Sequence, residues 1–309
     1  MRLVFAGTPA VALPSLEALV SAGHEVVAVL TRPPAAQGRG RRLVSSPVQD
    51  WAQARGVECL TPSSAKDPAL AEWLARLAPD CCPVVAYGGL VPGSLLDMPR
   101  FGWINLHFSL LPRHRGAAPV QHAILAGDTI TGATAFRLVA ALDAGPVYGS
   151  LTAPIGPTTT AGELLDVLAH EGAGLLAEAV AAAGAGVEPH PQPDSPVSLA
   201  PKVTLDGVRL DWAQPAERLD RLIRAANPQP GAWTVVDGRR LTVLLAEATD
   251  EAVPPGEMVV RKREVLVGTG TTALRLLDVV PEGRRSMLGP DWARGLRRAV
   301  PLSAEWPKS

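Results

Sequence analysis

The residues of this sequence best suited to chemistry on a carbonyl group are an asparagine and a histidine two positions apart. Asn105 and His107 belong to the run Trp103–His107, whose composition predicts a β-strand, so their side chains are expected on one face of it. They come at the carboxyl end of that strand, where open α/β sheets bind ligands. There an amide could hold a carbonyl oxygen and an imidazole could move a proton. Spacing alone favours the plainer interpretation, in which both are buried polar groups satisfied within the protein.

An aspartate in a later loop could assist the histidine. Asp143 lies in the segment Ala141–Gly145, which follows another predicted strand. A carboxylate in that position could orient the imidazole and stabilise its protonated form. The commoner role of an aspartate in such a segment is that of an ordinary turn residue.

The segment Thr31–Leu43 is basic and rich in glycine and proline. Its arginines are Arg32, Arg39, Arg41 and Arg42. No acidic residue occurs between positions 25 and 50 of the chain. Such a segment cannot bury itself, but it can fold onto a polyanion such as a nucleic acid. The alternative is a loop that only improves solubility.

Two familiar kinds of ligand site are not supported by the spacing of residues. The first turn between a strand and a helix, Gly7–Ala10, has one glycine and a proline where a dinucleotide-binding turn needs G-x-G-x-x-G, so we expect only a helix start there. Cys59 stands alone and Cys81 is adjacent to Cys82, which is neither a zinc-ligand spacing nor a disulfide framework. We therefore predict no metal site, and free thiols fit a reducing cytosol.

Composition places the chain among globular proteins. It has 309 residues, of which 47% are hydrophobic and 19% charged, and its formal net charge is -1. These values exclude a disordered tail and a protein that is basic throughout, although not a local basic patch. No stretch is long and apolar enough to predict a membrane span, and the first apolar run, Leu3–Ala6, is too short for a signal peptide. We expect a cytoplasmic protein.

The elements that must position these residues follow an alternating pattern. Leu3–Ala6, Leu13–Val20 and Glu25–Thr31 read as strand, helix and strand, which is the unit of a parallel sheet. Further strands are predicted at Cys82–Tyr87, Trp103–His107 and Ala133–Val139, and helices at Pro47–Arg55, Pro68–Leu77, Pro119–Ala126 and from the capping box at Thr160–Glu163 to Ala183. The pattern predicts a doubly wound, Rossmann-like α/β domain with a mostly parallel sheet.

The composition changes in the proline-rich segment Val187–Pro201, which predicts an extended linker. A helix over Pro215–Ala226 and a hairpin joining Trp233–Val236 to Leu241–Ala246 follow it. Short strands at Val259–Gly268 and Ala273–Val280 complete a small β domain. We therefore predict a first domain over residues 1–187, a linker over 188–205 and a second domain over 206–309.

Assembled, these motifs resemble the 10-formyltetrahydrofolate-dependent formyltransferases. The signature of that family is an Asn-x-His strand, a following Ser-Leu-Leu-Pro and a distant Asp in a loop. Here it reads Asn105-Leu-His107, Ser109–Pro112 and Asp143. The branch of the family that acts on tRNA adds further motifs, which here read Phe5–Pro9, Gly38–Leu43, Val85–Gly88, Arg115–Pro119, Arg209–Trp212, Ile223–Pro228, Pro230–Trp233 and Pro281–Met287.

The resemblance implies transfer of a formyl group from 10-formyltetrahydrofolate to the α-amino group of methionyl initiator tRNA, without a metal. Asn105, His107 and Asp143 would be catalytic. The residues expected around the folate are Ser109, Leu110, Leu111, Pro112, Tyr87, Leu90 and Val139. The residues expected to bind tRNA are Arg39, Arg41 and Arg42. The second domain would be an OB-fold-like β-barrel that binds tRNA, and the protein would be a monomer.

The sequence departs from the family pattern beside the expected site. Ala141 and Ala144 stand where a glycine and a threonine are usual, which puts the folate contacts of that loop in question. Phe108 stands where a small residue or proline is usual, and Gln229 replaces a tryptophan. Two alternatives remain: a formyltransferase that acts on glycinamide ribonucleotide or an amino sugar, and a catalytically silent RNA-binding protein. The second domain and the arginine segment argue against the nucleotide enzyme, and the intact Asn-His-Asp set argues against the silent one.

Overall fold

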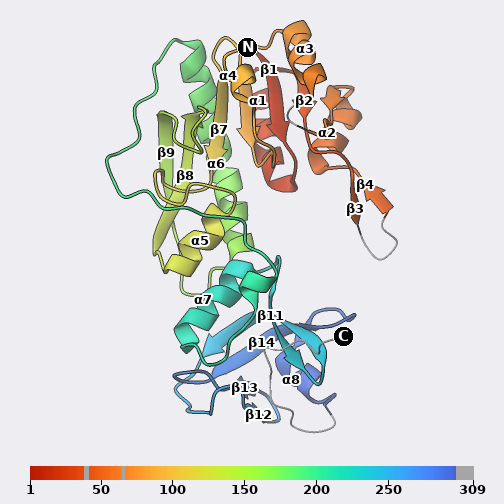
Figure 1. Ribbon diagram of the computed structural model, residues 1–309, viewed down its shortest axis with the longest axis vertical. Coiled ribbons are helices and arrows are strands. Elements are labelled where there is room, and N and C mark those ends of the chain that lie inside the picture. The colour runs from red at the N-terminus through yellow and green to blue at the C-terminus, as the bar shows by residue number, and fades with distance from the viewer. Residues whose placement is uncertain (38–41, 65–66, 297–309) are drawn as a thin grey trace. The chain divides into compact units, whose positions relative to one another are not determined.

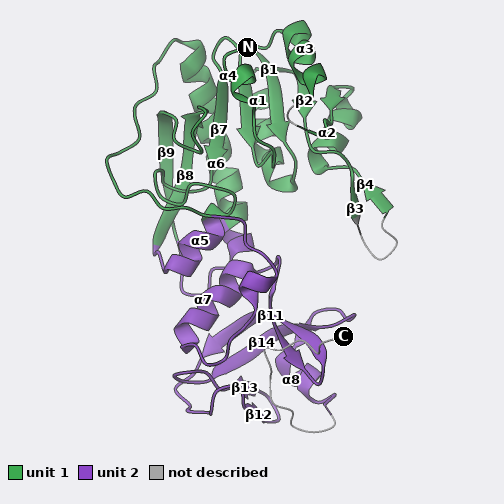
Figure 2. Cartoon of the chain, viewed as in Figure 1, with its two compact units in different colours: residues 1–119, 130–154, 165–200 green, residues 120–129, 155–164, 201–309 purple. Residues whose placement is uncertain are grey.

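The computed structural model describes residues 1–37, 42–64 and 67–296 (Figure 1). The chain forms two compact units, neither of which is continuous in sequence (Figure 2). The first unit contains residues 1–119, 130–154 and 165–200, and the second contains residues 120–129, 155–164 and the described residues from 201 onward. Within the described residues, no helix combines the length and the apolar character that crossing a bilayer requires.

A seven-stranded sheet with the strand order β5-β2-β1-β6-β7-β8-β9 forms the centre of the first unit. Its strands are β1 (Arg2–Gly7), β2 (Glu25–Leu30), β5 (Glu58–Leu60), β6 (Cys82–Val85), β7 (Trp103–His107), β8 (Ile130–Arg137) and β9 (Val147–Pro154). The strands from β5 to β7 are parallel, whereas β8 runs antiparallel to β7 and β9 antiparallel to β8. The predicted doubly wound, mostly parallel sheet is confirmed, with an antiparallel edge added.

The helices of this unit begin where the sequence supplies caps. They are α1 (Leu13–Ser21), α2 (Pro47–Arg55), α3 (Pro68–Leu77), α4 (Gly93–Leu96) and α6 (Ala161–Gly184), the last of which starts in the second unit. Ser46 accepts a hydrogen bond from the Gln49 N–H, and Asp67 caps α3 in the same way. At the start of α6, Glu163 accepts from the Thr160 N–H and Thr160 from the Glu163 N–H, the predicted capping box.

Helices cover both faces of the sheet because the central strands are buried on both. Trp103 on β7 lies in a buried cluster with Trp73 of α3, and its indole N–H donates to the Leu95 carbonyl of α4 at 2.7 Å. The Leu106 side chain points to the opposite face of the same strand. It packs so closely against Gly172 of α6 that a Cβ added to Gly172 would lie 2.9 Å from Leu106. Residues 105 and 107 share the parity of Trp103, so strand alternation places them on the α3 and α4 side of the sheet.

A two-stranded ribbon, which the sequence did not predict, branches from this unit beyond β2. It consists of β3 (Ala35–Gln37) and β4 (Arg42–Val44), paired antiparallel with Gln37 opposite Arg42. The ribbon is separate from the main sheet.

The second unit is an antiparallel half-barrel, as expected for a small β domain. Its strands are β10 (Ala232–Val236), β11 (Arg239–Ala248), β12 (Met258–Val260), β13 (Val265–Val267), β14 (Leu274–Pro281) and β15 (Met287–Leu288), in the order β10-β11-β14-β13-β12 with β15 on β14. Its helices are α5 (Pro119–Ala126), most of which lies in this unit, α7 (Ala216–Ala226) and α8 (Gly289–Ala293). The register shifts between β11 and β14 near Leu245, which increases the curvature of the sheet.

The core of the half-barrel forms between α7 and the concave side of the sheet. It includes Trp212, Trp233, Ile223 and Val279, all less than a tenth exposed. Burying each such side chain stabilises the fold by roughly 1.5–3 kcal/mol. The turn between β10 and β11 is made by Asp237 and Gly238 with φ of 48° and 71°, a conformation that matches the twist of a hairpin.

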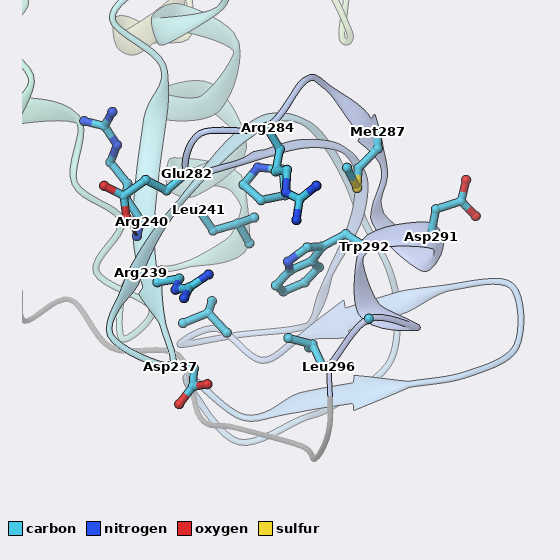
Figure 3. A pocket seen from close by; sticks show the side chains of 13 residues that line it. Asp237, Arg239, Arg240, Leu241, Glu282, Arg284, Met287, Asp291, Trp292 and Leu296 are labelled. Atoms are coloured by element: carbon cyan, nitrogen blue, oxygen red, sulfur yellow. Dashed lines mark hydrogen bonds between the residues drawn. The ribbon is translucent and has the colours of Figure 1, made fainter.

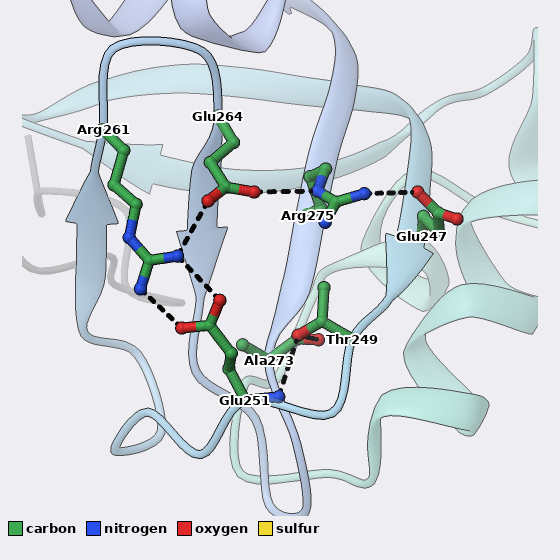
Figure 4. A network of polar contacts seen from close by, with 7 residues as sticks. All are labelled: Glu247, Thr249, Glu251, Arg261, Glu264, Ala273 and Arg275. Carbon is green, nitrogen blue, oxygen red and sulfur yellow. Dashed lines mark hydrogen bonds and ion pairs between the residues drawn. The ribbon is translucent and has the colours of Figure 1, made fainter.

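Charged side chains link the strands on the surface of this half-barrel (Figure 4). Arg261 pairs with Glu251 and Glu264, and Arg275 joins Glu264 to Glu247 at 3.1 and 2.8 Å. All five side chains are between 23 and 57% exposed, so solvent and salt screen each pair and its contribution to stability is small. The network belongs to the stability of the unit.

Candidate active site

Strand β7 carries the predicted asparagine and histidine in the interior of the sheet. Asn105 lies opposite Val84 of β6 and Phe136 of β8, and His107 lies opposite Thr134. Asn105 is half-buried, and its side-chain amide makes no hydrogen bond to any of the residues that the structure describes. The His107 side chain is only 6% exposed. The strand therefore presents a free amide one pleat away from a buried imidazole.

The hydrogen bond of His107 to a backbone carbonyl fixes where its proton sits. Its Nε2 lies 2.9 Å from the carbonyl oxygen of His114. Because a carbonyl can only accept, Nε2 must carry the hydrogen, and in the neutral ring the acceptor nitrogen is then Nδ1. The ring also meets the edge of Phe136 at 6.4 Å between centroids. His114 itself is 5% exposed, so this hydrogen bond is shielded from solvent.

Asp143 lies beside the free nitrogen of His107. Its Oδ2 is 3.8 Å from His107 Nδ1, longer than a direct hydrogen bond, so the contact is electrostatic. The same oxygen accepts from the Gly116 N–H at 2.8 Å. Asp143 itself has the left-handed φ of 46°, which is unusual for a residue other than glycine. The carboxylate is 12% exposed and is held in place by its backbone and by Gly116.

Two opposing influences act on the pKa of His107. Burial disfavours the charged ring and lowers its pKa below the ordinary value of 6.5. The Asp143 carboxylate and the His114 carbonyl raise the pKa and offset part of that effect. At neutral pH the ring is therefore neutral, with an acceptor nitrogen facing a carboxylate that stabilises the protonated ring once it forms.

The Ser109–Pro112 segment is mostly buried scaffold. The Ser109 hydroxyl donates to the Arg113 carbonyl at 2.6 Å, and its own carbonyl accepts from the Thr134 hydroxyl at 2.7 Å. Thr134 also accepts from the Leu111 N–H at 3.2 Å. Leu111 and Pro112 are buried and Leu110 is half-buried. The segment is thus locked to β8, beside His107.

The other residues predicted around the folate divide into buried and exposed. Strand β6 ends at Val85, earlier than predicted, because Ala86 has a φ of 47° that leaves the strand. The Tyr87 ring lies in the core and its carbonyl accepts from the Thr8 hydroxyl at 2.8 Å. Leu90 is 77% exposed and Val139 is 40% exposed, so both offer apolar surface after the ends of strands.

Of the predicted tRNA-binding residues, only Arg42 falls within the described part of the chain. It is exposed on β4 of the ribbon. Arg39 and Arg41 lie outside the described residues. No group of three histidine, cysteine, aspartate or glutamate side chains arranged to hold a metal occurs among the described residues.

A pocket of about 880 Å³ opens in the second unit, beside α8 (Figure 3). Arginines 239, 240 and 284 line it together with acidic residues 237, 282 and 291 and the ring of Trp292. Its charge is mixed, and it contains none of the residues predicted from the sequence as catalytic or ligand-binding.

Two family descriptions together account for most of the chain. "Formyl transferase" matches residues 1–180, and "Formyl transferase, C-terminal domain" matches residues 202–297. The fold and the first match define the chain as a formyl transferase. Among solved structures, HypX from Aquifex aeolicus in complex with tetrahydrofolic acid has a TM-score of 0.62 at 18% identity, over 96% of this chain and 47% of that one. WlaRD, a sugar 3N-formyl transferase, has a TM-score of 0.65 at 13% identity, over 92% of this chain and 99% of that one.

Curated relatives narrow the class. The methionyl-tRNA formyltransferase of Thermobifida fusca (strain YX) is 57% identical over 96% of this chain and 97% of its own length. That of Mycobacteroides abscessus is 56% identical, over 96% of this chain and 97% of its own. The chain belongs to the methionyl-tRNA formyltransferase family.

Proposed function

We propose that Asn105, His107 and Asp143 catalyse transfer of the formyl group of 10-formyltetrahydrofolate to the α-amino group of methionyl initiator tRNA. The observation that carries this assignment is the state of the His107 ring. Its Nε2 is committed to the His114 carbonyl, so Nδ1 is the acceptor, and it lies 3.8 Å from a carboxylate. A neutral base with a nearby anion is suited to take a proton from an attacking amine.

The reaction forms one carbon–nitrogen bond and breaks another. The amine attacks the formyl carbon, and the carbonyl oxygen becomes an oxyanion in a tetrahedral intermediate. The Asn105 amide, which has no partner among the described residues, donates to that oxygen, and the interaction strengthens as the charge develops. His107 Nδ1 accepts the amine proton and becomes an imidazolium that Asp143 stabilises. The proton then passes to N10 of the folate, which leaves as the bond to carbon breaks.

The pterin of the folate would lie beside the Ser109–Pro112 segment. Main-chain groups of residues 86–90 and 139–143 would contact it, and the exposed Leu90 and Val139 supply apolar surface for a planar ring. The locked turn at Ser109 supports this role by holding its backbone rigid beside β7. No metal is needed, since N10 is protonated directly.

In this proposal the two domains would have different functions, catalysis in the first and tRNA binding in the second. Residues 1–187 form the catalytic domain, 188–205 the linker and 206–309 the tRNA-binding domain in this proposal. Arg39, Arg41 and Arg42 would contact phosphates near the acceptor stem of the tRNA, and the exposed position of Arg42 supports the access of that side chain to RNA. The protein would act as a monomer in the cytoplasm.

A formylation assay with four acceptors tests the proposed substrate. Purified protein and 10-formyltetrahydrofolate are mixed with methionyl initiator tRNA, uncharged initiator tRNA, glycinamide ribonucleotide or an amino-sugar nucleotide. We expect an N-formyl product only with the charged tRNA. Transfer to either small acceptor would replace the proposed substrate, and binding of tRNA without any transfer would identify a silent RNA-binding protein.

A further inference from the structure

The proline-rich segment after α6 is fastened along the catalytic loops. We call residues 188–200 the strap. Near one end, His190 exchanges backbone hydrogen bonds with Val147 at 2.6 and 2.9 Å. Near the other, the Arg115 N–H donates to the Ser198 carbonyl at 2.9 Å and the Ala200 N–H to the Arg115 carbonyl at 2.7 Å. The strap thus belongs to the first unit, and its middle is held from both sides.

Two polar side chains of the strap turn away from solvent. Of the polar strap residues, Gln192 and Ser198 are half-buried, whereas Glu188, His190, Asp194 and Ser195 are exposed. Of the apolar ones, Pro189 is half-buried and Ala200 is buried. Gln192 contacts the backbone of Asp143, and Ser198 contacts the backbone of His114. Asp143 and His114 are the two residues that interact with the nitrogens of the His107 ring. Burial of only these two among the polar side chains of a proline-rich segment indicates that Gln192 and Ser198 have specific partners.

Gln192 holds the loop of the catalytic aspartate. Its Nε2 donates to the carbonyl of Asp143 at 2.7 Å and to the carbonyl of Gly145 at 3.0 Å. Its Oε1 accepts from the Arg115 guanidinium. Carbonyls only accept and a guanidinium only donates, so the orientation of this amide is forced.

The loop of Asp143 needs such an external support. Within it, the Ala144 N–H donates to the Ala141 carbonyl at a long 3.3 Å. Ala141 and Ala144 carry no polar side chains, and Asp143 has a positive φ that costs conformational energy. The double contact from Gln192 offsets that cost where the backbone turns.

Ser198 holds the other partner of His107. The Ser198 hydroxyl oxygen accepts a hydrogen bond from the His114 N–H at 2.8 Å. The His114 carbonyl in turn accepts the hydrogen bond from His107 Nε2. His114 has a φ of 57°, so its backbone is also in a left-handed conformation. The strap therefore fixes a residue on each side of the imidazole.

We infer that Gln192 and Ser198 are positioning residues for catalysis: they fix the Asp143 carboxylate and the His114 carbonyl, and through them the His107 ring. The inference rests on the proposed roles of His107 and Asp143. Displacing a catalytic group by about 1 Å costs up to roughly a hundredfold in rate, so the loss of either contact should act on turnover more than on binding.

Two substitutions at Gln192 separate its contacts. Gln192→Met keeps the size and removes all three hydrogen bonds, whereas Gln192→Glu keeps an acceptor for Arg115 and removes both donors. We expect each to lower kcat at least about tenfold, with KM for 10-formyltetrahydrofolate and for tRNA changed less than threefold. Val197→Ala, an exposed position of the same strap, should match the wild type. Loss of activity with Met but not with Glu would assign the effect to Arg115 and overturn the inference.

A double-mutant cycle tests whether Gln192 acts through Asp143. In an Asp143→Asn background, Gln192→Met should cost less than threefold in kcat, because the group it positions has already lost its charge. Equal factors in both backgrounds would mean a general structural role. A second readout is the pKa of His107, followed by NMR: Gln192→Met should lower it further, because Asp143 no longer supports the charged ring.

Ser198 provides an independent check with its own rescue. Ser198→Ala should lower kcat, whereas Ser198→Thr, which keeps the hydroxyl, should restore it. Wild-type kcat in both Gln192 variants and in Ser198→Ala would overturn the inference. If His107→Ala alone retained normal kcat, the proposed catalytic roles would fail instead, so the two failures are distinguishable.

Discussion

Replacing Asp143 by asparagine removes one charge from the site with little change of shape. The Asp143 Oδ2 lies 3.8 Å from His107 Nδ1, and the two side chains are 12% and 6% exposed. At an effective dielectric constant of about 20, opposite charges at that separation attract by about 4 kcal/mol. The asparagine dipole replaces part of this, and if about 3 kcal/mol of stabilisation of the imidazolium is lost, the rate should fall roughly 10²-fold.

The measurement is single-turnover formyl transfer to methionyl initiator tRNA, from pH 5 to 8, by the wild type and Asp143→Asn. The asparagine oxygen can still accept from the Gly116 N–H, so we expect similar folate affinity and thermal stability. Asp97→Asn, at an exposed position, is the matched control. A rate within threefold of the wild type for Asp143→Asn would refute the electrostatic role.

The direction of the pH shift provides a second criterion. Asp143 raises the pKa of His107 while burial lowers it, so removing the carboxylate lowers that pKa further. His107 acts as a base in its neutral form, which then persists to lower pH. The acidic limb of the rate profile should therefore move to lower pH in Asp143→Asn, and a move to higher pH would contradict the assignment.

Three further predictions concern other parts of the molecule. Asn105→Ala should lower kcat by roughly 10²-fold or more with little change in folate binding, and near-normal turnover would exclude it as the donor to the oxyanion. Replacing Arg41 and Arg42 together by alanine should raise KM for tRNA and flatten its salt dependence, and an unchanged salt slope would exclude phosphate contacts. Gly132→Ala should destabilise the fold by at least roughly 1–3 kcal/mol in chemical denaturation, because its Cβ would lie 1.9 Å from the Leu151 carbonyl oxygen, and an unchanged midpoint would contradict that packing.

Local signals in the sequence were sufficient for the elements that carry their own caps or burial pattern. Helices Pro47–Arg55 and Pro68–Leu77 have the predicted bounds because Ser46 and Asp67 cap them. Strand Trp103–His107 was recognised because it is apolar on both sides of its polar residues, as a central strand of a covered sheet must be.

Elements that depend on distant partners were not recognised. Strands β3, β4 and β5 have only three residues each, and β9 mixes glycine, serine and threonine with its apolar residues without a regular alternation. Pairing with neighbours makes these segments strands. The sequence predicted a strand over Ala133–Val139, but β8 covers Ile130–Arg137 because it pairs with β9 from Ile130 onward.

In the candidate site, too, the sequence indicated some residues and not others. The spacing of Asn105 and His107 indicated a common face, and the family pattern added Asp143. The pattern did not indicate the carbonyl of His114, which fixes the tautomer of His107, or the contact of Gln192 with Asp143, which joins residues 49 positions apart. Such contacts join loops that are distant in sequence and meet only in the folded protein. No local sequence pattern indicates them.

The most direct test of the account is the pH dependence of single-turnover transfer by the wild type and His107→Ala, with saturating 10-formyltetrahydrofolate and methionyl initiator tRNA. The account predicts a rate at least roughly 10²-fold lower in His107→Ala. It also predicts that the wild-type acidic limb, centred below the ordinary histidine pKa of 6.5, is absent from the variant. A His107→Ala rate close to wild type, with the same acidic limb, would contradict the claim that His107 accepts the amine proton.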